Sequence, residues 1–186
     1  MDEVELKLQL ERAHADCFGW AMACCGRDRD DAEEVLQTVY LTVLDGRARY
    51  DGRSTFRTWL FGVIRRTAAS ERRKAWLRGL REAGRREAGR ATREAGRGTR
   101  EAGSVAPDPF APPDAEVEQE SRRDGLRHAL GHLAKRQREV LQLVFYHDLT
   151  VEEAAAVMHV SVGSARTHYA RGKARLAVLL GDMKDF

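Results

Sequence analysis

The sequence predicts an all-α protein made of two small helical domains joined by a flexible linker. Only 4 of its 186 residues are Pro, Ala, Leu, Arg and Glu dominate, and strand-like alternation of polar and apolar residues is nearly absent. Apolar residues recur at helical spacing in two blocks, 1–76 and 118–186, and a chain of this length can hold two small domains. The segment between them, 77–117, begins as a basic repeat and continues as a Pro-rich acidic stretch.

The first expected helix covers about residues 4–25, because apolar side chains follow one stripe along it. All three cysteines, Cys17, Cys24 and Cys25, fall within this helix. Cysteines so close on one helix do not suggest a structural disulfide, and the cytosol keeps thiols reduced. A redox or metal sensor formed with His14 is the alternative, but we favour inward-facing cysteines that act as small apolar residues.

Two further helices complete the first block. Asp28 or Asp30 can cap a helix that runs to about Leu44. After a polar loop, Ser54 or Thr55 can open a third helix, whose apolar stripe continues into a basic run. The stripe consists of Phe56, Trp59, Leu60, Val63 and Ile64, and the basic run of Arg65, Arg66, Arg72, Arg73 and Lys74.

The middle of the chain has low complexity. The tetrapeptide Arg-Glu-Ala-Gly recurs at Arg81, Arg86, Arg93 and Arg100. A repeat with a Gly in every unit and no large apolar residue cannot bury a core and is expected to be a poor helix. The prolines that follow stiffen the chain, and Ala and Gly at the seam positions argue against a coiled coil.

The C-terminal block is expected to contain about four helices around a core of its own. Apolar residues recur there at helical spacing, which favours amphipathic helices packed on one another. The expected core residues are Leu126, Leu130, Leu133, Val140, Leu141, Val144 and Phe145.

The stretch 150–176 has the pattern of a helix-turn-helix. Thr150 and Glu153 can form a capping box, and after a turn Ser161 or Ser164 can cap a second helix with a cation-rich face. In this motif the second helix enters the DNA major groove. An ordinary helical hairpin with a solvated basic face is the alternative. The candidate DNA contacts are Ser161, Ser164, Arg166, Thr167, His168, Tyr169, Arg171, Lys173 and Arg175.

Other classes of function find little support. No nucleophile–base pair, metal triad or phosphate-binding loop is evident, so we expect neither an enzyme nor a cofactor nor a metal site. His128 and His132 lie one helical turn apart but lack a third ligand, which favours surface histidines. The absence of a signal peptide and of any apolar run of spanning length predicts a cytoplasmic protein without membrane insertion.

Three segments in this order resemble those of a bacterial extracytoplasmic-function (ECF, group IV) RNA polymerase sigma factor. Residues 31–44, DAEEVLQTVYLTVL, look like the family's helix that docks on the β′ clamp helices of the polymerase. Residues 54–74, STFRTWLFGVIRRTAASERRK, look like the segment that melts and recognises the −10 element, and residues 133–176 look like the domain that recognises the −35 element. Leu44 replaces the family's usual Trp, and Thr67 and Ser70 stand where Asn and Asp are common.

The resemblance implies which residues do what. Core RNA polymerase would be bound through its β′ clamp helices and β flap, and an anti-sigma factor would mask both domains. The main rival is a stand-alone helix-turn-helix regulator whose first block senses a ligand or redox state and which binds duplex DNA without polymerase. The implied polymerase contacts are Asp31, Glu33, Glu34 and Gln37, and the implied −10 DNA contacts are Arg53, Ser54, Thr55, Phe56, Arg65, Arg66, Arg72, Arg73 and Lys74.

Overall fold

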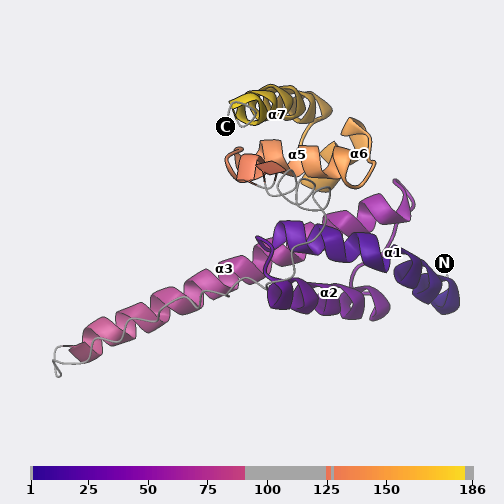
Figure 1. The fold of residues 1–186 in the computed structure, drawn as a ribbon. Coiled ribbons are helices and arrows are strands. Elements are labelled where there is room, and N and C mark those ends of the chain that lie inside the picture. The colour runs from indigo at the N-terminus through magenta and orange to yellow at the C-terminus, as the bar shows by residue number, and fades with distance from the viewer. Residues whose placement is uncertain (1, 91–124, 127, 183–186) are drawn as a thin grey trace, which may run out of the picture.

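The computed structural model describes residues 2–90, 125–126 and 128–182, and these contain helices and no strand. The first block forms α1 (Glu3–Cys24), α2 (Arg29–Leu44) and α3 (Phe56–Arg90). The second block contains helical residues at 125–126 and 128–131, followed by α5 (Lys135–Phe145), α6 (Val151–Met158) and α7 (Val162–Asp182). Figure 1 shows α5–α7 stacked on α1–α3, with the second half of α3 projecting from the body. The all-α prediction with two helical domains is confirmed.

Helix starts follow local hydrogen bonding. The Asp28 carboxylate accepts from the backbone N–H of Asp31 at 2.9 Å and caps α2. Thr55 Oγ1 accepts from the backbone N–H of Thr58 at 3.1 Å at the start of α3. Each of these bonds satisfies a backbone donor that the first helical turn leaves unpaired. Of the alternatives left open by the sequence, Asp28 and Thr55 are therefore the caps.

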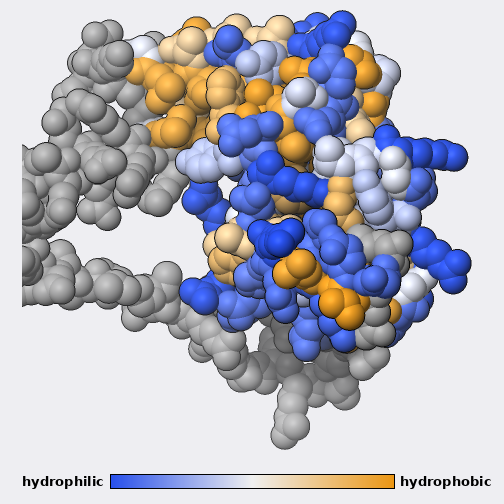
Figure 2. All heavy atoms as spheres, turned by 90° about the vertical axis from the view of Figure 1, so that its right-hand side faces the viewer, coloured by the Kyte–Doolittle hydropathy of each residue, from blue (hydrophilic) through white to orange (hydrophobic). Residues whose placement is uncertain are grey.

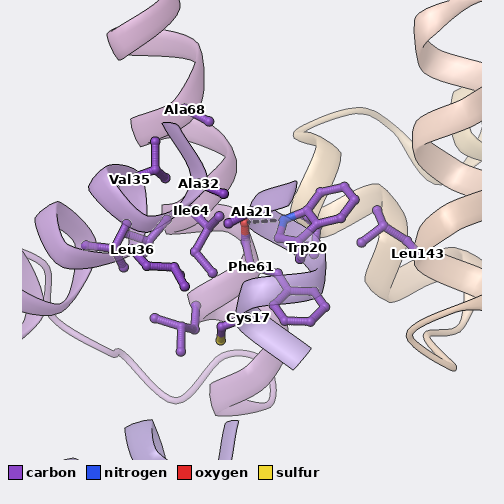
Figure 3. Packing of buried hydrophobic residues seen from close by; sticks show 14 of the residues in the cluster. Cys17, Trp20, Ala21, Ala32, Val35, Leu36, Phe61, Ile64, Ala68 and Leu143 are labelled. Carbon is purple, nitrogen blue, oxygen red and sulfur yellow. Dashed lines mark hydrogen bonds between the residues drawn. The ribbon is translucent and has the colours of Figure 1, made fainter. Parts of the chain in front are cut away.

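Trp20 and Phe61 form the centre of the first domain. Trp20 Nε1 donates to the backbone oxygen of Phe61 at 3.0 Å, and the two rings stack with centroids 5.8 Å apart. Both residues are buried, so the hydrogen bond satisfies an indole N–H that would otherwise be costly in the core. Figure 3 shows this pair with core residues around it, among them Cys17, Ala32, Val35, Leu36 and Ile64.

The core of the first domain continues into the second. α6 packs on α3, and Leu143 of α5 points toward the Trp20 ring (Figure 3). A smaller cluster around Leu130, Leu133 and Leu141 belongs to the second domain alone. The sequence predicted two separate cores, and the structure instead joins most of the buried residues of both domains in one. The members from the second domain are Val140, Leu143, Leu149, Ala154, Val157 and Met158.

On one face of the molecule, hydrophilic and hydrophobic residues lie in separate regions. On the side shown in Figure 2, hydrophilic residues cover most of the band between the two layers of helices. Hydrophobic side chains gather over the C-terminal helices in the upper part of that view. Hydrophilic residues therefore cover the junction between the two layers of helices on this face.

Two expectations are corrected. Phe145 was predicted in the core but is 57% exposed, because the inner face of α5 is formed by Val140, Leu141 and Leu143, and Phe145 ends the helix beside Tyr169. The repeat was predicted to be a poor helix, but α3 continues through it to Arg90. Elongation from a packed helix requires no new nucleus, and Ala, Arg and Glu are strong helix formers that offset one Gly per unit. The repeats at Arg93 and Arg100 lie outside the described residues.

We predict that Leu143→Ala lowers the free energy of unfolding by about 2–5 kcal/mol, the usual cost of such a cavity. All three tryptophans (Trp20, Trp59 and Trp76) lie in the first domain. Because Leu143 belongs to the shared core, its loss from the second domain should shift the urea transition followed by tryptophan fluorescence.

The matched control is Phe145→Ala on the same helix, where the side chain is exposed and the expected change is small. A tryptophan transition that Leu143→Ala leaves in place, while the helical circular dichroism signal shifts, would contradict the shared core.

Candidate nucleic-acid interface

The helix-turn-helix predicted from the sequence is present in α6 and α7. Thr150 Oγ1 accepts from the Glu153 backbone N–H at 3.1 Å, and the Glu153 carboxylate accepts from the Thr150 backbone N–H at 2.9 Å. His159 ends α6 in the left-handed region (φ 52°). Ser161 Oγ then accepts from the Ser164 backbone N–H at 3.1 Å and caps α7. The capping box and Ser161 are the caps expected, whereas nothing in the sequence pattern marked His159.

Small residues bring α7 close to its neighbours. Ala154, Ala155 and Ala165 are buried at the contact between α6 and α7. At Gly172 a Cβ atom would lie 3.1 Å from Leu141 Cδ1 and 3.3 Å from the Gln137 backbone oxygen. These distances are shorter than ordinary packing, so α7 can lie on α5 at this spacing because residue 172 has no side chain.

The outward face of α7 carries exposed cations. Arg166 forms an ion pair with Glu152 of α6 at 2.7 Å, and the hydrogen bond from Arg166 lowers the pKa of Glu152. Both side chains are exposed, so the pair is weak and can be exchanged for another anion. Tyr169 is half buried, stacks on Phe145 with centroids 6.0 Å apart, and packs against both clusters. Thr167, Arg171, Lys173 and Arg175 are exposed, His168 is half buried, and Ser161 and Ser164 are exposed at the turn.

The acidic candidates of α2 are all exposed. Asp31 lies in the first turn, where its charge favours the helix dipole. Glu33 accepts from Arg29 Nε at 2.8 Å. Glu34 and Gln37 lie one turn apart on the outside of the helix. The helix therefore presents an acidic strip to solvent while its other face is buried.

Three aromatic rings support the loop before α3. Tyr50, Phe56 and Trp59 lie with their centroids 5.4–5.6 Å apart, and all three are half buried. The Tyr50 hydroxyl donates to the Ser54 backbone oxygen. This cluster holds Arg53, Ser54 and Thr55 at the surface of the first domain, beside aromatic side chains that are half buried.

The basic run of α3 divides into three arginines that contact other parts of the chain, Arg65, Arg66 and Arg72, and two exposed residues that make no such contact with the described residues, Arg73 and Lys74. Arg65 pairs with the Glu139 carboxylate of α5, and only 17% and 9% of these side chains are exposed. Arg66 Nη1 donates to His159 Nε2 at 2.7 Å, since a guanidinium has no acceptor. Arg72 donates to the Cys24 backbone oxygen. Arg73 and Lys74 are exposed, and Lys74 pairs with Glu71 at 2.8 Å.

His147 is an ionisable group buried between the domains, with 6% of its surface exposed. Its ring meets Trp20 edge-on at 5.8 Å and Phe61 at 4.9 Å, and its Nδ1 has no hydrogen-bond partner among the described residues. Burial lowers the pKa of His147, and the nearby Arg57 lowers it further, while Asp16 and Asp148 act in the opposite direction. We call the packing of His147 on Trp20 and Phe61, together with the pairs Arg65–Glu139 and Arg66–His159, the closed contact. The closed form is the chain with this contact in place. No sequence pattern indicated that His147, His159 or Glu139 would contact the first domain.

The cysteines and surface histidines show no built reaction site. All three cysteines are free thiols, and burial raises the pKa of Cys17 and of Cys24 to about 12. Such thiols are rarely ionised and react slowly. His128 and His132 contact each other at 3.0 Å on the surface, and no group of three metal-ligating residues occurs in the described part of the chain. None of the described helices combines the length and apolarity needed to span a membrane.

Comparisons with known proteins agree with this architecture. Residues 10–78 match the family described as Sigma-70 region 2, and residues 123–176 match Sigma-70 region 4. The ECF RNA polymerase sigma factor SigX of Bacillus subtilis is 26% identical over 91% of this chain and 80% of its own length. The RNA polymerase sigma factor CarQ of Myxococcus xanthus is 28% identical over 82% of this chain and 76% of its own length.

Solved structures share the fold at low sequence identity. The sigma factor RpoE of Bartonella quintana, in complex with the anti-sigma factor NepR, gives a TM-score of 0.66 at 20% identity and covers 95% of this chain and 97% of its own. CnrH, in complex with the cytosolic domain of CnrY, gives 0.60 at 19% identity and covers 97% of this chain and 90% of its own. With region 2 and region 4 both matched in order over most of its described residues, this chain belongs to the sigma-70 family and is an ECF sigma factor.

Proposed function

We propose that this chain, as a group IV sigma factor, directs core RNA polymerase to promoters with separate −10 and −35 elements and that an anti-sigma factor controls it. The observation that carries the proposal is the capped α6–α7 motif, in which α7 packs on α5 and α6 and turns its cations to the outside. Transcription takes place in the bacterial cytoplasm, which is therefore the compartment this function requires.

The second domain would bind the −35 element through α7. Residues at the N-terminal end of a recognition helix contact base edges in the major groove. Arg166 and Thr167 hold this position, and Arg166 can leave Glu152 because both side chains are exposed. Arg171, Lys173 and Arg175 lie further along α7, where cations bind backbone phosphates and position the helix without selecting sequence.

The first domain would bind polymerase and the −10 element. The exposed acids of α2 suit a basic partner such as the clamp helices. The loop of Arg53, Ser54 and Thr55 and the half-buried ring of Phe56 offer a place for an unpaired base. Stacking of a base on an aromatic ring contributes about 1–3 kcal/mol, which offsets part of the cost of unstacking it from the duplex.

An anti-sigma factor is proposed by analogy with the two solved relatives. The RpoE structure is described as a complex with the anti-sigma factor NepR, and the CnrH structure as a complex with the cytosolic domain of CnrY. Their overall fold matches that of this chain over most of its length. A protein that holds the two domains together would keep both candidate DNA surfaces from a promoter.

The closed contact must separate for the proposed function. The two elements of such promoters lie about two helical turns apart, roughly 70 Å at 34–36 Å per turn. Domains that share a hydrophobic core cannot reach both positions. Of the residues that join the two predicted domains, 77–90 belong to α3 and rise about 1.5 Å each, and 91–117 span at most about 3.3 Å each. The resulting limit of roughly 110 Å permits the separation.

In vitro transcription tests the function directly. Core RNA polymerase supplemented with this chain should initiate at a defined set of start sites in a genomic promoter library, and core enzyme alone should not. Failure to initiate anywhere in a broad library would refute the proposal. A gel shift separates the rival regulator, because a stand-alone helix-turn-helix protein would bind its duplex equally well without core enzyme.

We predict that Arg166→Ala reduces initiation at promoters with an intact −35 element by about 10- to 100-fold, since a base contact contributes about 1–3 kcal/mol of discrimination. The control is Arg12→Ala, which removes an exposed cation of α1 outside both DNA surfaces. Run-off transcription measures both variants. An equal loss in both would mean that net charge, and not the α7 contact, is responsible.

We also predict that the closed form becomes less stable as the pH falls below about 6.5, the usual pKa of histidine. The pKa of His147 is lowered in the folded chain, so the unfolded chain takes up the proton first. The contribution of His147 is therefore complete above that value and is lost as the pH decreases toward the lowered pKa. His159 has a pKa lowered by burial and by Arg66 and acts in the same direction.

Urea denaturation at pH 7.5 and 5.5 measures this dependence. His147→Phe keeps an aromatic ring against Trp20 and Phe61 and removes the titrating group, so the stability of this variant should change less between the two pH values than that of the unmodified chain. The same change in both proteins would rule out His147 as the titrating group.

A further inference from the structure

A cavity of about 510 Å³ opens between the two domains. Its walls come from α1 and the turn after it, from α3, and from α5 with the residues just before it. Trp20, Cys24 and Leu130 form part of an apolar wall. A volume of this size lies in the usual range for small-molecule sites, about 300–1,000 Å³. Because both domains supply walls, the cavity exists in this form only while the closed contact holds.

The charges that line the cavity do not balance. Among the described residues on its walls, Glu139 is the single acid, and it already pairs with Arg65 and, at 3.2 Å, with Arg136. No ion pair of Arg27, Lys135 or Arg138 occurs in the described part of the chain. The cations on the walls are Arg27, Arg65, Arg72, Lys135 and Arg138.

The cations on the cavity walls repel one another. Burial lowers the pKa of Lys135, and repulsion from Arg72 and Arg65 lowers it further, against the opposite effect of Glu139. Like charges held on the walls of one cavity repel each other more strongly than in open water, because the local dielectric constant is lower. An anion placed between them would relieve this repulsion and gain charge-assisted hydrogen bonds.

We propose that the closed form of this chain binds a small anion with two or three linked phosphate groups in this cavity. Arg27, Lys135 and Arg138 supply three positive charges that form no ion pair with any other described residue, which matches the charge of a diphosphate or triphosphate better than that of a single sulfate or carboxylate. A guanidinium group can donate two parallel hydrogen bonds to two oxygens of one phosphate, and the ammonium group of Lys135 adds a compact positive charge. The apolar wall leaves room for an organic group attached to the phosphates.

Such a ligand would stabilise the closed form. It contacts cations of α5 in the second domain and of the turn after α1 in the first, so it binds the packed domains and not the separated ones. Occupation of the cavity would thus oppose promoter binding, in which Arg65 and Arg72 are candidate contacts. Binding of the anion itself is independent of the proposed function, and only this consequence for initiation rests on it.

Binding of sodium tripolyphosphate to the full chain tests the proposal. Isothermal titration calorimetry should give saturable binding of one anion per chain, and the thermal unfolding midpoint should rise with its concentration. The double variant Lys135→Gln/Arg138→Gln should weaken the affinity at least tenfold. The matched control is Arg12→Gln/Arg78→Gln, which removes the same charge from exposed positions outside the cavity and should change the affinity less than twofold.

Arg27→Gln provides a second, independent variant, because Arg27 lies in the turn after α1 and is exposed. It should also weaken binding severalfold, and circular dichroism of each variant without ligand verifies the fold. The proposal is overturned by the absence of saturable binding, by several anions per chain, or by an equal loss of affinity in the cavity and control variants.

Discussion

The packing of His147 against Trp20 and Phe61 is the contact on which the arrangement of the two domains depends. It places an uncharged ring from the loop after α5 on the central pair of the first domain, and the apolar residues of α5 and α6 close around it. An aromatic cluster of this kind is stable only while its members are dry and neutral. The ion pair Arg65–Glu139 is largely shielded from water in this arrangement, and Arg66 donates a hydrogen bond to His159 at the surface.

This contact gives the same side chains two competing roles. Arg65 and Arg66 are candidates for holding promoter phosphates, yet in the closed form they bind groups of the second domain. When the domains separate, water can hydrate Arg65 and Glu139, and Arg65 becomes available to bind a phosphate in place of Glu139. Closure and promoter binding therefore exclude each other. Docking on polymerase would stabilise the separated state, and binding of an inhibitor would stabilise the closed form. Either event shifts the equilibrium between the two states by the difference in its binding free energy.

The elements could be predicted from the sequence and their assembly could not. Asp28, Thr55, Thr150 and Ser161 act within one turn of the chain, so their capping roles are visible in the local pattern. Glu139 and His147 looked like ordinary polar residues of a helix and a loop, because their partners in the first domain lie more than 70 residues away. The predicted burial of Phe145 was wrong for a related reason. The spacing of apolar residues alone does not say at which residue the buried face of a helix ends. The repeat was misjudged because composition ignores the packed helix that precedes it.

The central claim is that the closed domains separate when the chain works. A fluorophore pair attached through unnatural amino acids at Glu11 of α1 and Ala177 of α7, both exposed, would report their distance. The free chain should give high energy transfer, and addition of core polymerase with promoter DNA should reduce it to a value typical of domains roughly 70 Å apart, the spacing of two turns of DNA. Unchanged high transfer in a complex that initiates transcription would contradict the account.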